Sequence, residues 1–249
     1  MFGPAHLTYI IASLLVTAGA LVGFHYIKNQ KWKDFVLKAC ALTCFLLHIS
    51  IMWVDFFVSG EAVARDNILI PIYFCNILMY LFMVVAFMRK SGRAFRALST
   101  FLAYGAFFGG MIALFYSVYL VNDPEITTYE TVKSLLSHSI LLLGCLYLFV
   151  GEYVKIRVSN VVPFLGGLAA CFALGGLVLL LYTVFGLPHV DGLFMYSPAI
   201  EGVPILNGYF IGGGMLVLVF AFTVIFEQFS KKKGERWYNK SFKEFLAEI

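Results

Sequence analysis

The sequence is poor in charged residues. Only 13% of its 249 residues are charged, which is about half of the share that soluble domains carry. A water-soluble fold has no means of burying a hydrophobic fraction of 61% while keeping so few charges for its surface. The composition therefore excludes a soluble enzyme and a nucleic-acid-binding domain, and we expect no nucleic-acid partner.

Cysteine is scarce as well. The five cysteines are an odd number and lie inside apolar runs, which argues against a disulfide framework. The HxxxH, HExxH and CxxC patterns of metal and redox sites are absent. We therefore expect neither a metal centre nor a cofactor.

What the chain has in excess is long apolar runs. A helix needs about 20 mostly apolar residues to cross a hydrocarbon layer ~30 Å thick. Seven runs reach that length, at 7–27, 35–58, 68–88, 96–121, 133–152, 161–186 and 204–229. Backbone amides in hydrocarbon must be satisfied within their own segment, so each run is predicted to be a helix. The predicted fold is all-α, a polytopic bundle of seven transmembrane helices whose first helix is retained rather than cleaved as a signal peptide.

Basic residues mark alternate ends of these runs. Of the 18 lysines and arginines, all but Arg65 and Lys133 lie beside the links after the first, third, fifth and seventh runs. Under the positive-inside rule this pattern places the N-terminus outside and the C-terminus in the cytosol. We interpret the basic patches as determinants of topology, and we expect a multi-pass integral membrane protein, in the cell membrane if the source is bacterial.

The predicted organisation is a seven-helix transmembrane domain over 1–230 and a cytosolic basic amphipathic tail over 231–249. Apolar residues of the tail recur at helical spacing, which predicts one amphipathic helix on the inner leaflet. These residues are Tyr238, Phe242, Phe245, Leu246 and Ile249. Glu227, just before the tail, is predicted to be a solvated terminal charge. The outer loop from Gly186 to Val203 is either a lid over the bundle or an ordinary interfacial loop.

Polar residues inside the apolar runs are the functional candidates, because hydrocarbon penalises polar groups. In the second run Cys44, His48 and Asp55 form one helical stripe. The third run carries Cys75 and Asn76 shortly after a proline, and the fifth run carries Ser134, His138 and Cys145 on one face. The histidines at 6 and 25 lie at the ends of the first run, where an interfacial position accounts for them.

Depth selects one pair from these candidates. Cys75 and His138 lie about seven and five residues below the outer boundary, or ~10 and ~8 Å deep. Of the five thiols only Cys75 shares a layer with His138, and a buried thiol needs such a base to react. The alternative is a small core cysteine and a histidine bonded to a neighbouring hydroxyl or carbonyl. A rival pair, Cys44 and His48, has metal-ligand spacing but supplies only two ligands.

Several short motifs resemble the YwaF-like family of integral membrane proteins. They are the opening Phe2-Gly3-Pro4-Ala5-His6-Leu7, the step Ile70-Pro71-Ile72-Tyr73-Phe74-Cys75-Asn76, the pair Ser137-His138 and the stretch from Phe194 to Pro204. The typical family motif is Leu-Pro-Leu-His/Gln-Leu-Cys followed by Asn, Asp or Ser, so the chain departs from it at Tyr73. The family includes a eukaryotic acyltransferase, transmembrane protein 164, that moves acyl chains between phospholipids through a cysteine and a histidine. The resemblance implies that these are Cys75 and His138.

The resemblance therefore predicts a membrane-embedded lipid acyltransferase that works through an acyl-cysteine, or a related lipid hydrolase in which water replaces the acceptor. Its partners are phospholipids or lysophospholipids. Asn76 or a freed backbone amide is the candidate oxyanion donor and Asp55 the candidate partner of the imidazole. The supporting or substrate-binding candidates also include His48, Tyr73 and Ser134. Two alternatives remain: a transporter or receptor-like binding protein in which His48 and Asp55 line a path, and a structural lipid-packing or scaffold protein.

Overall fold

Helices account for the regular structure of the chain. The computed structural model describes residues 3–59, 71, 73–116, 128–186, 191–200 and 202–248, without the side chains of Asp55, Val58, Ser59 and Leu246. Within these ranges there is no strand. The longer helices are α1 (Pro4–His25), α2 (Gln30–Ser59), α4 (Phe74–Phe87), α5 (Arg93–Phe115), α7 (Tyr129–Val150), α8 (Val161–Val184) and α9 (Gly208–Ser230).

Six of these helices are long and apolar enough to cross a membrane, and α4 is a shorter apolar helix of 14 residues. The prediction of an all-helical, multi-pass membrane protein is confirmed. Within the run expected over 68–88, helix α4 begins at Phe74. Residues 60–70 and 72 lie outside the described part of the chain.

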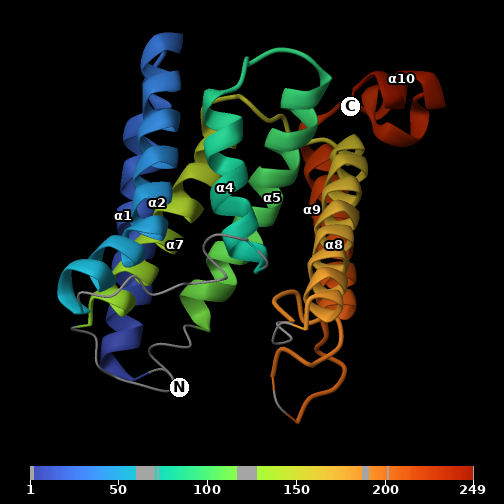
Figure 1. The fold of residues 1–249 in the computed structure, drawn as a ribbon. Coiled ribbons are helices and arrows are strands. Elements are labelled where there is room, and N and C mark those ends of the chain that lie inside the picture. The colour runs from blue at the N-terminus through green and yellow to red at the C-terminus, as the bar shows by residue number, and fades with distance from the viewer. Residues whose placement is uncertain are drawn as a thin grey trace.

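Helix α7 is the centre of the bundle. It contacts α1, α2, α4 and α5, while α8 packs on both α5 and α9 (Figure 1). Close packing at the centre depends on Gly144 of α7, because a Cβ at that position would lie 2.1 Å from the ring of Phe82 in α4. Phe82 is fully buried, so the ring has no free space to move into.

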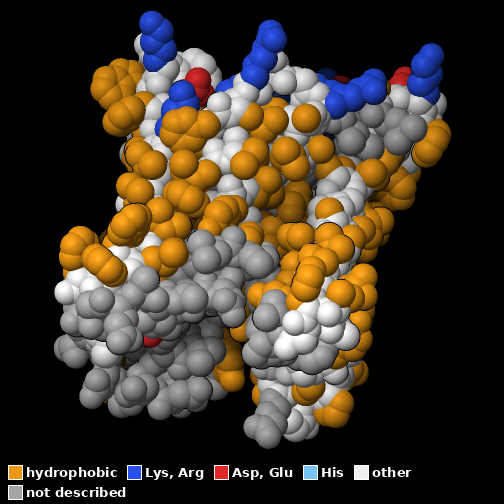
Figure 2. Space-filling view, in the orientation of Figure 1, with side chains coloured by type: hydrophobic (Ala, Val, Ile, Leu, Met, Phe, Trp, Pro, Cys, Tyr) orange, Lys and Arg blue, Asp and Glu red, His pale blue; other side chains and the backbone are white. Residues whose placement is uncertain are grey.

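The outer surface has the distribution of a membrane protein. Apolar side chains cover the sides of the bundle, whereas lysine and arginine side chains gather at the end that carries the C-terminal tail (Figure 2). Helix α1 is the most lipid-exposed, with Leu15 and Val16 both about two-thirds exposed.

The C-terminal tail does not form one helix. It consists of two 3-10 turns, Lys233–Glu235 and Trp237–Asn239, followed by the short helix α10 (Phe242–Ala247). Arg236 folds the chain back onto α9 by donating from Nη2 to the Gln228 carbonyl at 2.9 Å. Ser241 and Glu244 then bond reciprocally and begin α10 afresh. The continuous amphipathic helix predicted over 231–249 is therefore wrong, because these contacts with α9 and the new helix cap break it.

Glu227 is also placed differently from the prediction. Its side chain is 0% exposed. It accepts hydrogen bonds from the backbone N–H of Val158 at 2.9 Å and of Trp237 at 3.1 Å, and it pairs with Lys231 at 2.7 Å. The expectation of a solvated charge is wrong, since Glu227 joins the end of α9 to both the α7–α8 connection and the tail.

Candidate functional site

A cavity of about 500 Å³ lies between α4, α5 and α7 on one side and α8 and α9 on the other. Tyr9 of α1 and the segment from Gly192 to Leu206 complete its wall. Most of the lining side chains are hydrocarbon or aromatic. The ionisable or nucleophilic groups among them, apart from tyrosines, are Cys75, Ser134 and His138.

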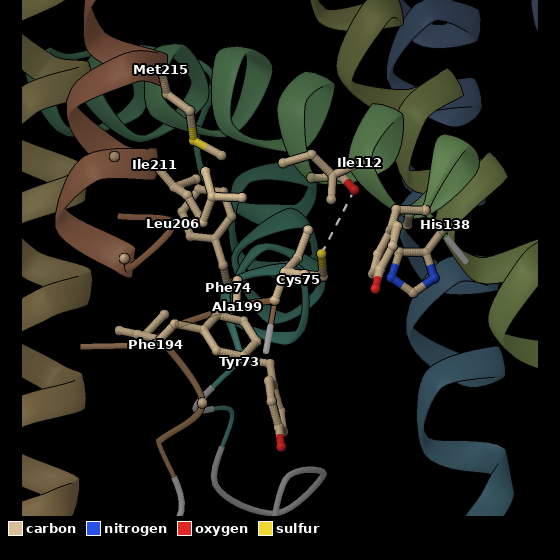
Figure 3. Close-up of a pocket in the computed structure, with 18 of the residues that line it drawn as sticks. Tyr73, Phe74, Cys75, Ile112, His138, Phe194, Ala199, Leu206, Ile211 and Met215 are labelled. Atoms are coloured by element: carbon tan, nitrogen blue, oxygen red, sulfur yellow. Dashed lines mark hydrogen bonds between the residues drawn. The ribbon is translucent and has the colours of Figure 1, made fainter. Parts of the chain in front are cut away.

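Cys75 is the second residue of α4. Tyr73 precedes the helix in an extended conformation and offers no side-chain cap, and the first helical bond runs from Ile77 N to the Tyr73 carbonyl. The Cys75 thiol donates to the carbonyl of Gly109 in α5, with a sulfur–oxygen distance of 3.8 Å (Figure 3). A Cβ on Gly109 would lie 3.3 Å from the sulfur, so the glycine leaves room for the thiol. The nucleophile candidate thus sits at a helix N-terminus and faces the cavity.

His138 lies on α7 and lines the same cavity. Its Nδ1 is 2.8 Å from the carbonyl oxygen of Ser134, one turn earlier. Because a carbonyl only accepts, this bond places the proton on Nδ1 and leaves Nε2 as the acceptor. In the view of Figure 3, Cys75 lies between His138 and the α9 side chains Ile211 and Met215. The Ser134 carbonyl, rather than its hydroxyl, orients the imidazole.

Tyr73 occupies the position where the family motif has His or Gln. Its ring lines the cavity and packs against Val178 and Tyr182 of α8. Tyr73 therefore provides an aromatic contact between the start of α4 and α8.

Two other predicted site residues lie elsewhere. Asn76 follows Cys75 by one position, about 100° around the helix, and is not among the residues that line this cavity. His48 of α2 is 4% exposed, with its ring 5.8 Å from that of Tyr80, and it does not line the cavity either. Asp55 belongs to α2, but its side chain lies outside the described part of the structure.

Neither a metal site nor a disulfide is present in the described ranges. No three His, Cys, Asp or Glu side chains lie close enough together there to hold an ion. The five cysteines are free thiols, and Cys44 donates to the Ser137 carbonyl at 3.4 Å. Cys44 therefore contacts α7 rather than pairing with His48.

Sequence reasoning missed several contributors to the site. The described part of the outer loop lines the cavity with Phe194 and Ala199, as the lid interpretation expects, and Leu206 before α9 joins them. Tyr9 of α1 lines the cavity and donates to the Leu135 carbonyl at 2.9 Å. The position of this tyrosine within an otherwise aliphatic run was the sequence feature that could have marked it as a cavity residue.

His6 was likewise expected at the membrane interface. The structure buries its side chain against α5, with Nε2 2.9 Å from the carbonyl of Leu114. This contact fixes the beginning of α1 to the end of α5, beside the cavity wall formed by Ile112 and Ala113.

Comparison with known proteins gives a single result. The model of the TMEM164 family matches residues 1–229, whereas no curated protein and no solved structure matches the chain. The relation to transmembrane protein 164 that the motifs predicted is confirmed, and the YwaF-like name rests on the motifs alone. Since the match covers all six long apolar helices and the cavity between them, this multi-pass integral membrane protein belongs to the TMEM164 family.

Proposed function

We propose that the protein is a membrane-embedded acyltransferase that moves an acyl chain between lipids through a thioester at Cys75, with His138 as the general base. One observation carries the proposal: a thiol and an imidazole line the same largely apolar cavity of about 500 Å³. Pockets of this size hold ligands of lipid-chain dimensions. Membership of the TMEM164 family is consistent with such an enzyme.

The position of Cys75 at the start of α4 suits a nucleophile. The first N–H groups of a helix have no acceptor within the helix, and the macrodipole there favours negative charge. A thiolate at Cys75 gains from both effects. The N–H groups of the same turn are the candidate donors to the oxyanion of a tetrahedral intermediate, in place of the Asn76 side chain.

His138 supplies proton transfer through Nε2. It takes the Sγ proton, and the Cys75 thiolate attacks an ester carbonyl carbon of the donor lipid. The carbon–oxygen bond to the glycerol breaks, and the imidazolium returns its proton to the departing alkoxide, which leaves as a lysolipid. His138 then takes the proton of an acceptor hydroxyl, this oxygen attacks the thioester, and the thiolate of Cys75 leaves and recovers the proton.

The lining of the cavity favours lipids as both donor and acceptor. Apart from the reacting pair and a few hydroxyl groups, the walls offer hydrocarbon and aromatic side chains. Ile112 lines the cavity from α5 and is 47% exposed. We propose that lipid chains enter the cavity sideways, between the helices. We propose a phospholipid as donor and a lysophospholipid as acceptor, with hydrolysis when water replaces the acceptor.

We also propose seven membrane crossings, with the N-terminus outside and the C-terminus in the cytosol. Helix α2 ends and α5 begins at opposite ends of the bundle, and α4 lies between them (Figure 1). The 14 residues of α4 span about 21 Å, roughly two-thirds of a hydrocarbon layer. The gathering of lysine and arginine at the end that carries the tail supports a cytosolic position for that end (Figure 2).

The test is a transfer assay with purified protein. A phospholipid with an isotope-labelled acyl chain is mixed with an unlabelled lysophospholipid, and lipid mass spectrometry follows the label. We expect wild-type protein to transfer the label and both Cys75→Ala and His138→Ala to lose transfer. Matched controls are Cys40→Ala and His25→Ala, whose side chains lie away from the cavity. Transfer that survives Cys75→Ala would refute the proposal and favour a binding or transport protein.

A further inference from the structure

Residues 191–197 are held against α8 and α9 by close packing and hydrogen bonds. Leu193 lies against two glycines. A Cβ on Gly175 of α8 would come within 2.6 Å of the Leu193 side chain, and a Cβ on Gly208 of α9 would come within 2.0 Å of the Leu193 carbonyl oxygen. Gly208 N also donates to the Phe194 carbonyl at 2.7 Å. The two glycines therefore admit the chain between α8 and α9 and fix its depth.

A carboxylate organises the next turn of this segment. Asp191 accepts hydrogen bonds from the backbone N–H groups of Met195, Tyr196 and Ser197 at 2.7–2.8 Å and from the Ser197 hydroxyl at 2.8 Å. The Phe194 N–H bonds to the Asp191 backbone carbonyl at 3.1 Å. These bonds on both sides of Phe194 hold its backbone in one conformation.

That conformation is an unusual one for phenylalanine. Phe194 has φ = +53°, in the left-handed region that residues other than Gly, Asn and Asp avoid. Strained backbone conformations persist where the surrounding structure enforces them, and they cluster at ligand sites. Here the result is an aromatic ring that lines the cavity and projects toward Tyr73 (Figure 3).

We propose that Phe194 is a specificity-determining residue that limits the length of the acyl chain carried at Cys75. This inference rests on the proposed function. The reacting pair occupies the wall formed by α4 and α7, so a chain attached to Cys75 must lie against the opposite wall. On that wall the ring of Phe194 projects into the cavity from a backbone that hydrogen bonds with Asp191 and Gly208 hold in place.

The test measures cavity length without catalysis. Alkyl methanethiosulfonates of increasing length react with a thiol, form a disulfide and release methanesulfinate, so they place chains of known length on Cys75. Peptide mass spectrometry confirms labelling at this cysteine, and the melting temperature of each labelled protein is compared with that of the same variant unlabelled. Chains that fill the cavity stabilise the protein, and chains that overfill it destabilise it.

We expect one alkyl chain length to stabilise the wild-type protein most. This optimal length should be longer in Phe194→Ala and shorter in Phe194→Trp. Phe194→Ala removes the six ring carbons, and partial collapse of the space leaves a shift of about two to four carbons. Phe185→Ala is the matched control, because this ring is 70% exposed and does not line the cavity. If Phe194→Ala fails to fold, Phe194→Trp and Phe194→Leu decide the question.

An optimum that stays at the same length in the Phe194 variants and in Phe185→Ala would overturn the inference, whatever the protein catalyses. The proposed function fails separately, through absent label transfer in the wild-type protein. A second arm follows the same variants in the transfer assay with a mixture of donor chain lengths. There Phe194→Ala is expected to shift the products toward longer chains, and an unchanged distribution would contradict the inference.

Discussion

Glu227 offers a sharp test of how the end of the bundle that carries the C-terminal tail is held together. Replacing it by alanine removes the acceptor for the N–H groups of Val158 and Trp237 and the partner of Lys231. Val158 is buried, so its N–H is left without an acceptor in apolar surroundings, at a cost of about 1–3 kcal/mol. Trp237 is partly exposed and can turn to water, which limits its loss to about 1 kcal/mol.

The ion pair adds little, because Lys231 keeps 20% of its side chain exposed and its loss is worth about 1 kcal/mol at most. Together these losses come to about 2–5 kcal/mol, close to the cost of removing one partner from a buried pair. For a chain of this size the melting temperature should fall by about 4–20 °C. Glu227→Gln keeps an acceptor but not the charge and should lose about half as much.

Circular dichroism in a fixed detergent gives the melting temperatures. Glu235→Ala is the charge-matched control, since Glu235 lies exposed in the tail. A Glu227→Ala variant that melts within about 2 °C of this control would show that Glu227 is not bonded as described.

Three other predictions concern the cavity and its supports. Gly109→Ala places a Cβ 3.3 Å from the Cys75 sulfur, so the thiol must move by a few tenths of an ångström. The rate of label transfer should fall about two- to fivefold with little loss of stability. Gly213→Ala, where nothing lies within 4 Å of the added Cβ, should leave the rate unchanged. Gly144→Ala forces a Cβ into the buried ring of Phe82 and should lower the free energy of unfolding by about 3 kcal/mol. Thermal unfolding measures this change, and an unaltered melting temperature would contradict the close approach of α4 and α7. Partial burial raises the pKa of Asp191, but the hydrogen bonds from Tyr196, Ser197 and Met195 outweigh it and hold the pKa below its ordinary value. The stability from Asp191 is therefore present above the unfolded pKa of about 4 and is lost as the pH falls through the folded pKa, so the melting-temperature gap between wild type and Asp191→Asn should close in acid; a gap that stays constant would show that the carboxylate is not bonded this way.

Hydropathy was sufficient to predict the helices, because a helix in hydrocarbon needs only a long apolar run to be recognised. The same scarcity of polar groups made Cys75 and His138 stand out, and both line the cavity. Hydropathy did not show that α4 begins at Phe74, since the preceding residues are as apolar as those that follow; Pro71 was the available signal for a later start.

Contacts between segments that are distant in the sequence could not be predicted from local sequence patterns. Glu227 looked like a terminal charge because lysines follow it, but its burial depends on where the α7–α8 connection and the tail return in space. The tail has helical spacing throughout, yet bonds to α9 interrupt it. The wall formed by Phe194 depends on glycines in two helices that only the fold brings together. Each of these misses reflects a tertiary contact that overrides a local pattern.

The acyl-enzyme itself is the most direct measure of the central claim. Wild-type protein is incubated with a phospholipid, and intact-protein mass spectrometry is followed by peptide mapping. The account predicts an adduct of acyl mass on Cys75 that hydroxylamine removes, that Cys75→Ala lacks and that Cys171→Ala retains. A His138→Ala protein that acylates as fast as wild type, or an adduct on any cysteine other than Cys75, would contradict it.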